Sequence, residues 1–150
     1  MNKLVLRVCC LAVVLSAAPA ISSDLPDPKL TPGLANPALT TDVICRPGFK
    51  TRIYRSVPTA RKREVFAEYG MRPNEAPCPC EVDHLIPIDL GGANWSPNLW
   101  PQSHSTSIKK DMLEKRLHDE VCAGKIELDT AQHEIAKDWV EAYRKWLGSP

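Results

Sequence analysis

The segment from Glu81 to Gln102 constrains this chain more than any other part of its sequence. An acid and a histidine, Asp83 and His84, stand side by side in an apolar stretch that is typical of a strand. The glycine pair Gly91-Gly92 punctuates that strand, and Asn98-Leu99 closes the loop that follows. Because neighbouring side chains of a regular strand point to opposite faces, Asp83 and His84 can serve one site only if the strand bends or ends there.

Hydrophobic spacing predicts the extent of this strand and three helices elsewhere in the chain. The strand is predicted over Pro77 to Leu90. Helices are predicted from Thr59 to Tyr69, from Ile108 to Cys122 and from about Thr130 to Leu147, with Asp129 capping the last of them. A chain of this length has room for one core, so the expected fold class is a small single α+β domain.

The N-terminus has the pattern of a secretory signal peptide, predicted over residues 1–20. Lys3 and Arg7 give a positive start, and the apolar run that follows is short for a membrane span. Ala18-Pro19-Ala20 offers a cleavage site, with an uncleaved membrane anchor as the alternative. After cleavage the protein is expected to be secreted or periplasmic, without stable membrane association. Residues 21–44 are expected to form a proline-rich, extended and mobile leader to a domain at residues 45–150.

Four of the six cysteines lie beyond the predicted cleavage site, and an even number in a secreted chain favours disulfides. We favour Cys45–Cys122 among the three possible pairings. Cys78-Pro79-Cys80 would then close a very tight ring or stay reduced, which is an objection to this choice. A zinc site is the alternative, but Cys78 and Cys80 lack the usual two-residue gap between ligands.

The motif in the central segment resembles that of the HNH endonucleases. The matching residues, in order and near the right spacing, are Asp83, His84, Pro87, Gly91, Gly92, Asn98 and Leu99. From about Cys45 to Trp146 the chain looks like a secreted bacterial branch of that group. The resemblance implies a ββα-metal unit, with a hairpin over about Glu81 to Trp100 and its helix over Ile108 to Cys122, plus flanking helices.

The resemblance also implies a role for each motif residue. His84 would be the general base, Asp83 a metal ligand, and Asn98 the residue that fixes the loop and helps to orient the histidine. The third motif position departs from the family, because the residues before Lys110 are the weak ligands Thr106 and Ser107. We therefore expect His104 to be the second metal ligand. Mg²⁺ or Mn²⁺ is the expected ion, with Zn²⁺ or Ni²⁺ as alternatives.

The function expected from this resemblance is metal-dependent hydrolysis of phosphodiester bonds in DNA, or also in RNA, with low sequence specificity. Removal of Lys3 and Arg7 leaves the mature chain close to neutral, so any basic surface for nucleic acid must be local. The basic run Arg61 to Arg63 is a solvated helix face unless it borders the cleft, where it would contact phosphate. The alternatives are a non-catalytic nucleic-acid-binding module and an envelope interaction module on the same scaffold.

Overall fold

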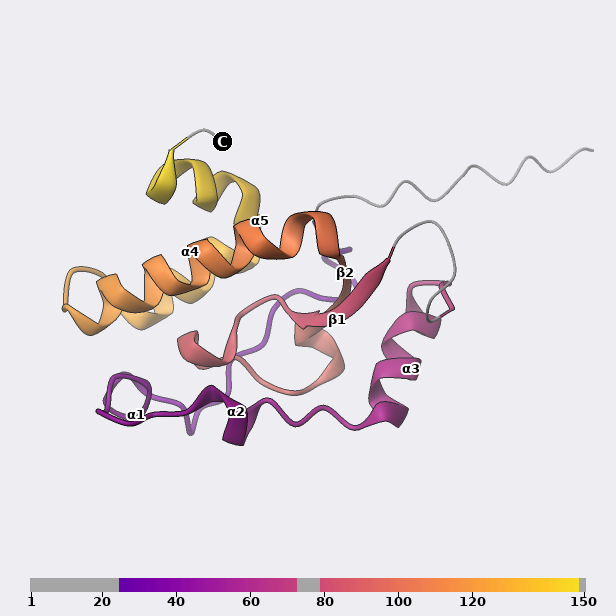
Figure 1. The fold of residues 1–150 in the computed structure, drawn as a ribbon, viewed down its shortest axis with the longest axis horizontal. Coiled ribbons are helices and arrows are strands. Elements are labelled where there is room, and N and C mark those ends of the chain that lie inside the picture. Colours follow the sequence, from indigo (N-terminus) through magenta and orange to yellow (C-terminus); the bar gives the residue numbers. More distant parts are fainter. Residues whose placement is uncertain (1–24, 73–78, 149–150) are drawn as a thin grey trace, which may run out of the picture.

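The computed structural model describes residues 25–72 and 79–148. At its centre is an antiparallel hairpin of β1 (Cys80–His84) and β2 (Leu99–Ser103), in which His84 pairs with Leu99 and Cys80 with Ser103. The helices around the hairpin are α1 (Thr41–Ile44), α2 (Thr51–Tyr54), α3 (Thr59–Glu68), α4 (His104–Cys122) and α5 (Leu128–Leu147) (Figure 1). The prediction of a small α+β domain is confirmed.

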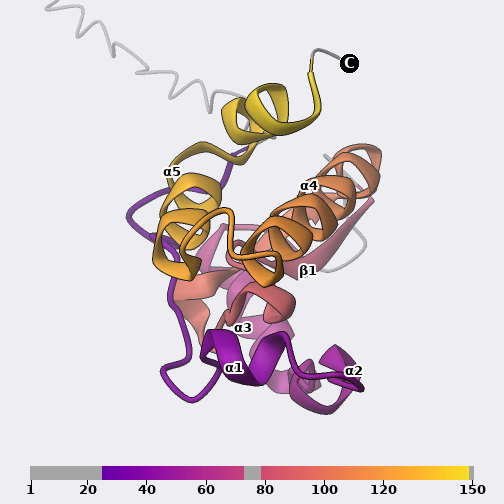
Figure 2. The same ribbon diagram turned by 90° about the vertical axis from the view of Figure 1, so that its left-hand side faces the viewer.

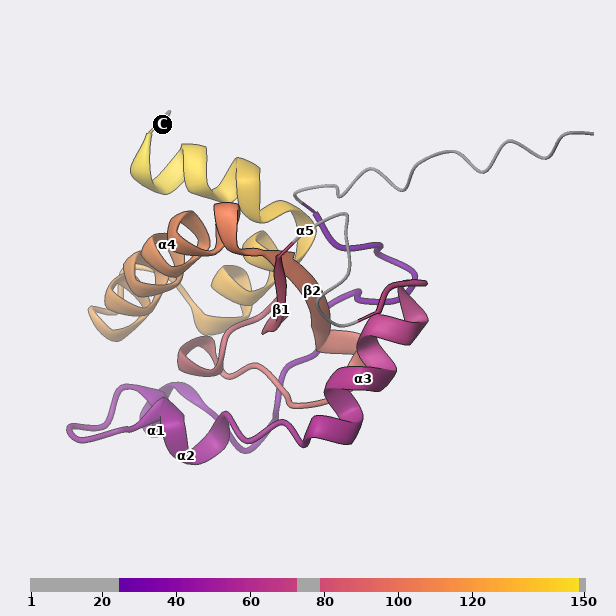
Figure 3. The same cartoon turned by 45° about the vertical axis from the view of Figure 1, so that its right-hand side comes forward.

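The helices enclose the hairpin from two sides. Helices α4 and α5 lie on one side of it, and α5 turns back along α4 (Figure 2). Helix α3 lies on the other side, next to β2 (Figure 3). The side chains that join α4 to α5 are apolar and fully or almost fully buried: Leu113, Leu117, Val121, Ala131, Ile135 and Trp139. The spacing also predicts Ile108 and Met112 in this buried stripe, and that part of the prediction is wrong because they are 70% and 51% exposed.

The connection between the two strands is a compact loop. Strand β1 ends at His84, short of the predicted end at Leu90, because a 3₁₀ turn, η1 (Ile88–Leu90), replaces the last part of the strand. Gly92 allows the loop to fold back on itself, since a Cβ atom there would lie 1.7 Å from the carbonyl oxygen of Ile86. A second 3₁₀ turn, η2 (Ser96–Asn98), leads into β2.

The last two helices begin earlier in the chain than the sequence predicts. Helix α4 begins at His104, where the hydroxyl oxygen of Ser103 accepts a hydrogen bond from the Ser105 amide at 3.3 Å. Helix α5 begins at Leu128 after Glu127, so the predicted cap at Asp129 is wrong. Non-helical dihedral angles at Asp138 kink α5.

The described part of the predicted leader, residues 25–44, packs against the domain. Thr31 is 1% exposed and Leu39 is 2% exposed. Ala35 forms a β-bridge with Gly92 of the loop between β1 and β2, here called the central loop. The segment is largely irregular, as its prolines predict, but the expectation of a mobile leader is wrong for these residues. The predicted signal peptide, residues 1–20, lies outside the described residues.

A disulfide joins Cys45, at the end of α1, to Cys122, at the end of α4, which confirms the favoured pairing. Cys80 is disulfide-bonded as well. Among residues 25–72 and 79–148, no helix combines the length and apolar character that a membrane span requires.

Candidate functional site

A polar cleft opens where β1 ends and α4 passes behind it. Its volume is about 270 Å³, and its lining combines four carboxylates, one imidazole and two cationic side chains. The lining residues are Arg55, Val57, Lys62, Glu81, Val82, Asp83, His84, Pro87, Ile88, Asp111 and Glu114. Both members of the Asp83–His84 pair border the cleft because the strand ends at His84, as the sequence requires of a shared site.

His84 is 6% exposed, and its orientation is set by Asn94. The imidazole Nε2 lies 2.7 Å from Oδ1 of Asn94, while the amide nitrogen of Asn94 donates to the backbone carbonyl of Tyr54. Because a carbonyl can only accept, the Asn94 oxygen must face the imidazole, and the proton therefore sits on Nε2. This tautomer leaves the lone pair of His84 on Nδ1.

The electrostatics of the cleft keep that imidazole neutral. Burial lowers the pKa of His84 below its ordinary value of 6.5, and the positive charges of Lys110 and Arg55 lower it further. The hydrogen bond to Asn94 and the charge of Asp83 oppose this shift without cancelling it. At neutral pH His84 is therefore an unprotonated base.

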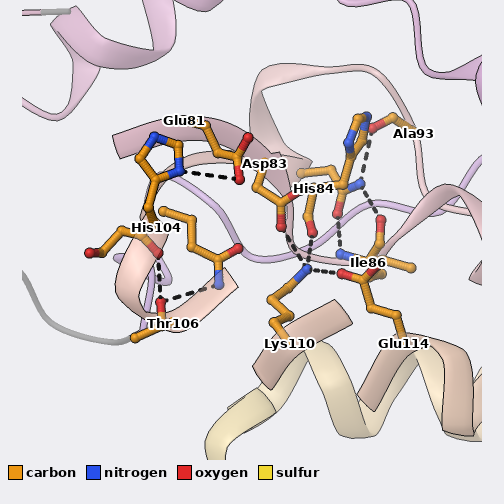
Figure 4. A network of polar contacts seen from close by, with 12 residues as sticks. Glu81, Asp83, His84, Ile86, Ala93, His104, Thr106, Lys110 and Glu114 are labelled. Carbon is orange, nitrogen blue, oxygen red and sulfur yellow. Dashed lines mark hydrogen bonds and ion pairs between the residues drawn. The ribbon is translucent and has the colours of Figure 1, made fainter. Parts of the chain in front are cut away.

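Beneath the cleft, Lys110 links α4 to the end of β1. Its side chain is 0% exposed, and its ammonium lies 2.8 Å from Oδ2 of Asp83 and 2.6 Å from the His84 carbonyl oxygen. The same ammonium donates to the carboxylate of Glu114 one turn along α4 (Figure 4). Burial alone would lower the pKa of Lys110, but the Glu114 and Asp83 carboxylates outweigh it and raise the pKa above its usual range. A permanent positive charge therefore sits behind Asp83.

Asn98 is fully buried and fixes the central loop, as its motif position predicts. Its side-chain oxygen accepts hydrogen bonds from the amides of Ile86 at 2.9 Å and Leu34 at 3.2 Å. Its side-chain nitrogen donates to the carbonyl oxygens of Ile86 at 2.9 Å and Ala93 at 3.0 Å. Asn98 was also expected to help to orient the imidazole of His84. That part of the prediction needs correction, because the side chain in contact with the imidazole is Asn94.

His104 lies outside the lining of the cleft that Asp83 borders. His104 begins α4 beside the Cys80–Ser103 end of the hairpin, three strand positions from Asp83, or roughly 10 Å at the usual rise of a strand. Its Nδ1 lies 3.6 Å from Oε1 of Glu81, and its side chain is exposed (Figure 4). The pairing of Asp83 and His104 on one ion therefore stays a prediction, since His104 contacts Glu81 and is not part of the cleft lining.

The other two residues considered for the third ligand are engaged at the start of α4. Thr106 donates its hydroxyl to the Ser103 carbonyl at 3.1 Å, and Ser107 donates to the His104 carbonyl at 3.2 Å. Among the residues that the structure describes, no group of three or more His, Cys, Asp or Glu side chains could hold a metal ion by itself.

The donors in the cleft fit a hard cation better than a zinc-like one. Glu81, Asp83 and Asp111 place carboxylates along its lining, and Mg²⁺ or Mn²⁺ is commonly held by one or two carboxylates, with water and substrate phosphate as further ligands. Zn²⁺ and Ni²⁺ favour several nitrogen or sulfur ligands, which would have required His104 here. Asp83 is the carboxylate beside the candidate base.

Two cationic side chains also line the cleft. Arg55 follows α2, and Lys62 lies in the first half of α3. The basic run Arg61 to Arg63 was expected to contact phosphate only if it borders the cleft, and Lys62 does so. Its neighbour Arg61 contacts the central loop instead, donating to the hydroxyl of Ser96 at 3.2 Å.

Sequence reasoning missed Asn94 and the burial of Lys110. Asn94 carries only a weak signal, a side-chain amide shortly after the glycine pair and ten positions beyond His84. Lys110 reads in the sequence as an ordinary solvated lysine at the start of a helix. No protein-family model, curated protein or solved structure matches the chain. The likeness to HNH endonucleases therefore rests on the motif residues themselves.

Proposed function

We propose that this protein is a metal-dependent endonuclease that hydrolyses phosphodiester bonds at the Asp83–His84 cleft. The observation that carries the proposal is the state of His84. Its imidazole is neutral, its Nε2 proton is directed to Asn94, and it borders a cleft lined by carboxylates and cations. A neutral imidazole in such surroundings is suited to remove a proton from water near neutral pH.

The chemistry follows from these positions. Nδ1 of His84 takes a proton from a water molecule as the water oxygen attacks the phosphorus atom. The bond from phosphorus to the leaving oxygen breaks, and that oxygen takes a proton from a second water molecule. Arg55 and Lys62 offset the negative charge that builds up on the phosphate oxygens. Asp83, with Glu81 or Asp111, would hold a divalent ion that supplies Lewis-acid stabilisation of the same charge. Lys110 keeps the Asp83 carboxylate in place.

The proposed substrate is DNA, with RNA as the alternative, cut with low sequence specificity. Contacts to phosphate position a nucleic acid without reading its sequence, and the cleft offers mainly contacts of that kind. The proposed site of action is outside the cytoplasm. The signal-like pattern of residues 1–20 and the Cys45–Cys122 disulfide support this location.

The proposal is tested by cleavage of supercoiled plasmid with the oxidised domain. Mg²⁺, Mn²⁺, Zn²⁺ and Ni²⁺ are supplied separately, with a chelator and His84→Ala as controls. We expect cleavage with Mg²⁺ or Mn²⁺ that stops in chelator, and a loss of at least about 100-fold in His84→Ala, the usual contribution of a general base. Equal rates for the native protein and His84→Ala would show that His84 is not the base.

The second candidate function is a module that binds nucleic acid without cutting it. Two observations favour it: the described residues hold no three-ligand metal group, and one oxygen of Asp83 is already occupied by Lys110. A folded protein that binds nucleic acid but cleaves with none of the four ions would support this candidate and refute the endonuclease.

A further inference from the structure

A local basic segment borders the cleft in a chain that is close to neutral overall. Residues 50–63 contain six lysines and arginines and no acidic residue. The basic side chains are mostly exposed, and two of them, Arg55 and Lys62, line the cleft itself. Such a segment offers cationic side chains to the phosphates of a polyanion beside a cleft that itself carries four carboxylates.

An exposed tryptophan lies next to this segment. Trp95 is 62% exposed, whereas Trp100 and Trp139 are each 2% exposed. Trp146 is half-buried, and its ring nitrogen donates to Glu134 at 2.7 Å. Trp95 directly follows Asn94, the residue that holds the imidazole of His84. A large aromatic side chain is therefore in contact with solvent within one residue of the candidate site.

The loop that carries Trp95 is attached to the basic segment on both sides of the tryptophan. On one side Asn94 donates to the Tyr54 carbonyl, and on the other side Ser96 accepts from Arg61 at 3.2 Å. The carbonyl oxygen of Trp95 itself accepts from the Asn98 amide at 2.8 Å. The backbone of this loop is thus held in place before a ligand binds. Binding to the ring therefore costs little conformational entropy of the loop.

We propose that Trp95 stacks on an unpaired base beside the scissile phosphate while residues 50–63 hold the phosphate backbone. The inference rests on the proposed function and narrows its substrate to single-stranded nucleic acid. Every base has a face that an aromatic ring can cover, so this contact needs no particular sequence. In a duplex those faces are covered by neighbouring bases, and the contact would require unstacking.

The positive charge near Trp95 favours nucleic acid over a protein as the ligand of this ring. An exposed aromatic side chain alone would suit either. Here the loop that carries the ring is bound through Asn94 and Ser96 to residues 50–63, whose charged side chains are all positive. Alternating positive charge and aromatic surface is the combination that binds single strands.

The test is binding of an oligothymidylate of about eight nucleotides, in chelator, followed by the intrinsic tryptophan fluorescence of the oxidised protein. We expect the single strand to quench this fluorescence and a hairpin duplex of equal charge to bind more weakly. Trp95→Ala should remove the quenching and weaken binding of a labelled strand about tenfold or more. Trp95→Phe, which retains a ring, should bind within about threefold of the native protein. Lys137→Ala, which removes an exposed charge from α5, is the control and should bind normally.

The outcomes separate this inference from the proposed function. Cleavage together with unchanged binding in Trp95→Ala, or tighter binding of the duplex, would refute the stacking role and leave the endonuclease standing. Quenching that depends on Trp95 in a protein that cuts nothing would support the stacking role and refute the endonuclease. Absence of both binding and cleavage would refute both.

Discussion

At the scale of single residues, the site depends on how His84 is held. Asn94 fixes the proton on Nε2, and its own orientation is fixed by the Tyr54 carbonyl. This hydrogen bond raises the pKa of His84, whereas burial lowers it more strongly. Asn94 therefore positions the imidazole of His84 and also affects the pH range in which this imidazole is unprotonated.

Substitutions of Asn94 should move the acid limb of the pH–rate profile in opposite directions. In the proposed mechanism, activity needs the unprotonated imidazole and falls as pH drops through the pKa of His84. Asn94→Ala removes an interaction that raises this pKa, so the acid limb should move to lower pH while the maximal rate falls about tenfold. Asn94→Asp adds a negative charge and should move the limb to higher pH.

The measurement is plasmid cleavage by the three proteins across the pH range, with saturating Mg²⁺ or Mn²⁺. A merely structural role of Asn94 would lower the rate in both variants without moving the limb. Equal profiles in all three proteins would mean that Asn94 does not act through His84.

At the scale of elements, Lys110 joins α4 to β1 at the floor of the cleft. It is fully buried between Asp83, Glu114 and the His84 carbonyl, so its removal leaves two carboxylates without their counter-charge. Loss of one partner from a buried ionic group is strongly destabilising, whereas an apolar replacement of the whole group often is not.

Lys110→Met should lower the free energy of unfolding by about 3–5 kcal/mol. The double variant Lys110→Met/Glu114→Leu should regain much of that loss, because it removes a buried charge along with its partner. Lys109→Met, at the exposed neighbouring position, should change stability by less than about 0.5 kcal/mol. Urea unfolding of the three variants gives the comparison. A double variant as unstable as Lys110→Met would contradict an electrostatic cause.

Much of the element order could be predicted from periodicity, and the errors have local causes. The apolar stripe of α4 was predicted from Ile108 onward, but the helix starts at His104 because Ser103 caps it. That shift, with the register of β2, places His104 beside Glu81 and away from Asp83. A side-chain cap and the register of the hairpin, neither of which periodicity reports, decide these positions.

The side chains that complete the site are the hardest to predict. Asn94 lies in a glycine-rich loop without periodicity, and its partner Tyr54 is forty positions away. Glu114 lies four residues from Lys110 on the same helix, but Asp83 reaches Lys110 only after the hairpin packs on α4, and the burial of Lys110 depends on that packing. Asp83, His84 and Asn98 were accessible from the sequence because their motif positions are local and ordered.

At the scale of the whole molecule, one covalent link joins the first and the second half of the chain. The Cys45–Cys122 disulfide spans a sequence separation of 77 residues and connects the end of α1 to the end of α4. Helix α4 carries Lys110 and Glu114 behind the cleft. The N-terminal segment that α1 completes also covers the central loop, through the bridge between Ala35 and Gly92. The disulfide thus closes a loop that contains the entire candidate site.

Removal of this disulfide should weaken the fold far more than it alters the site. Cross-links that close long loops restrict the unfolded chain, and loss of a native one costs about 2–5 kcal/mol. We expect the double variant Cys45→Ser/Cys122→Ser to lose stability in that range in urea unfolding. Its cleavage rate per folded molecule, measured well below the unfolding midpoint, should stay within about threefold of the native rate, because both cysteines lie outside the cleft lining. The double variant is preferred to a reductant because Cys80 is disulfide-bonded too. An unchanged midpoint would show that the link adds little to stability, and a rate that collapses while the protein stays folded would show that it positions α4 for catalysis.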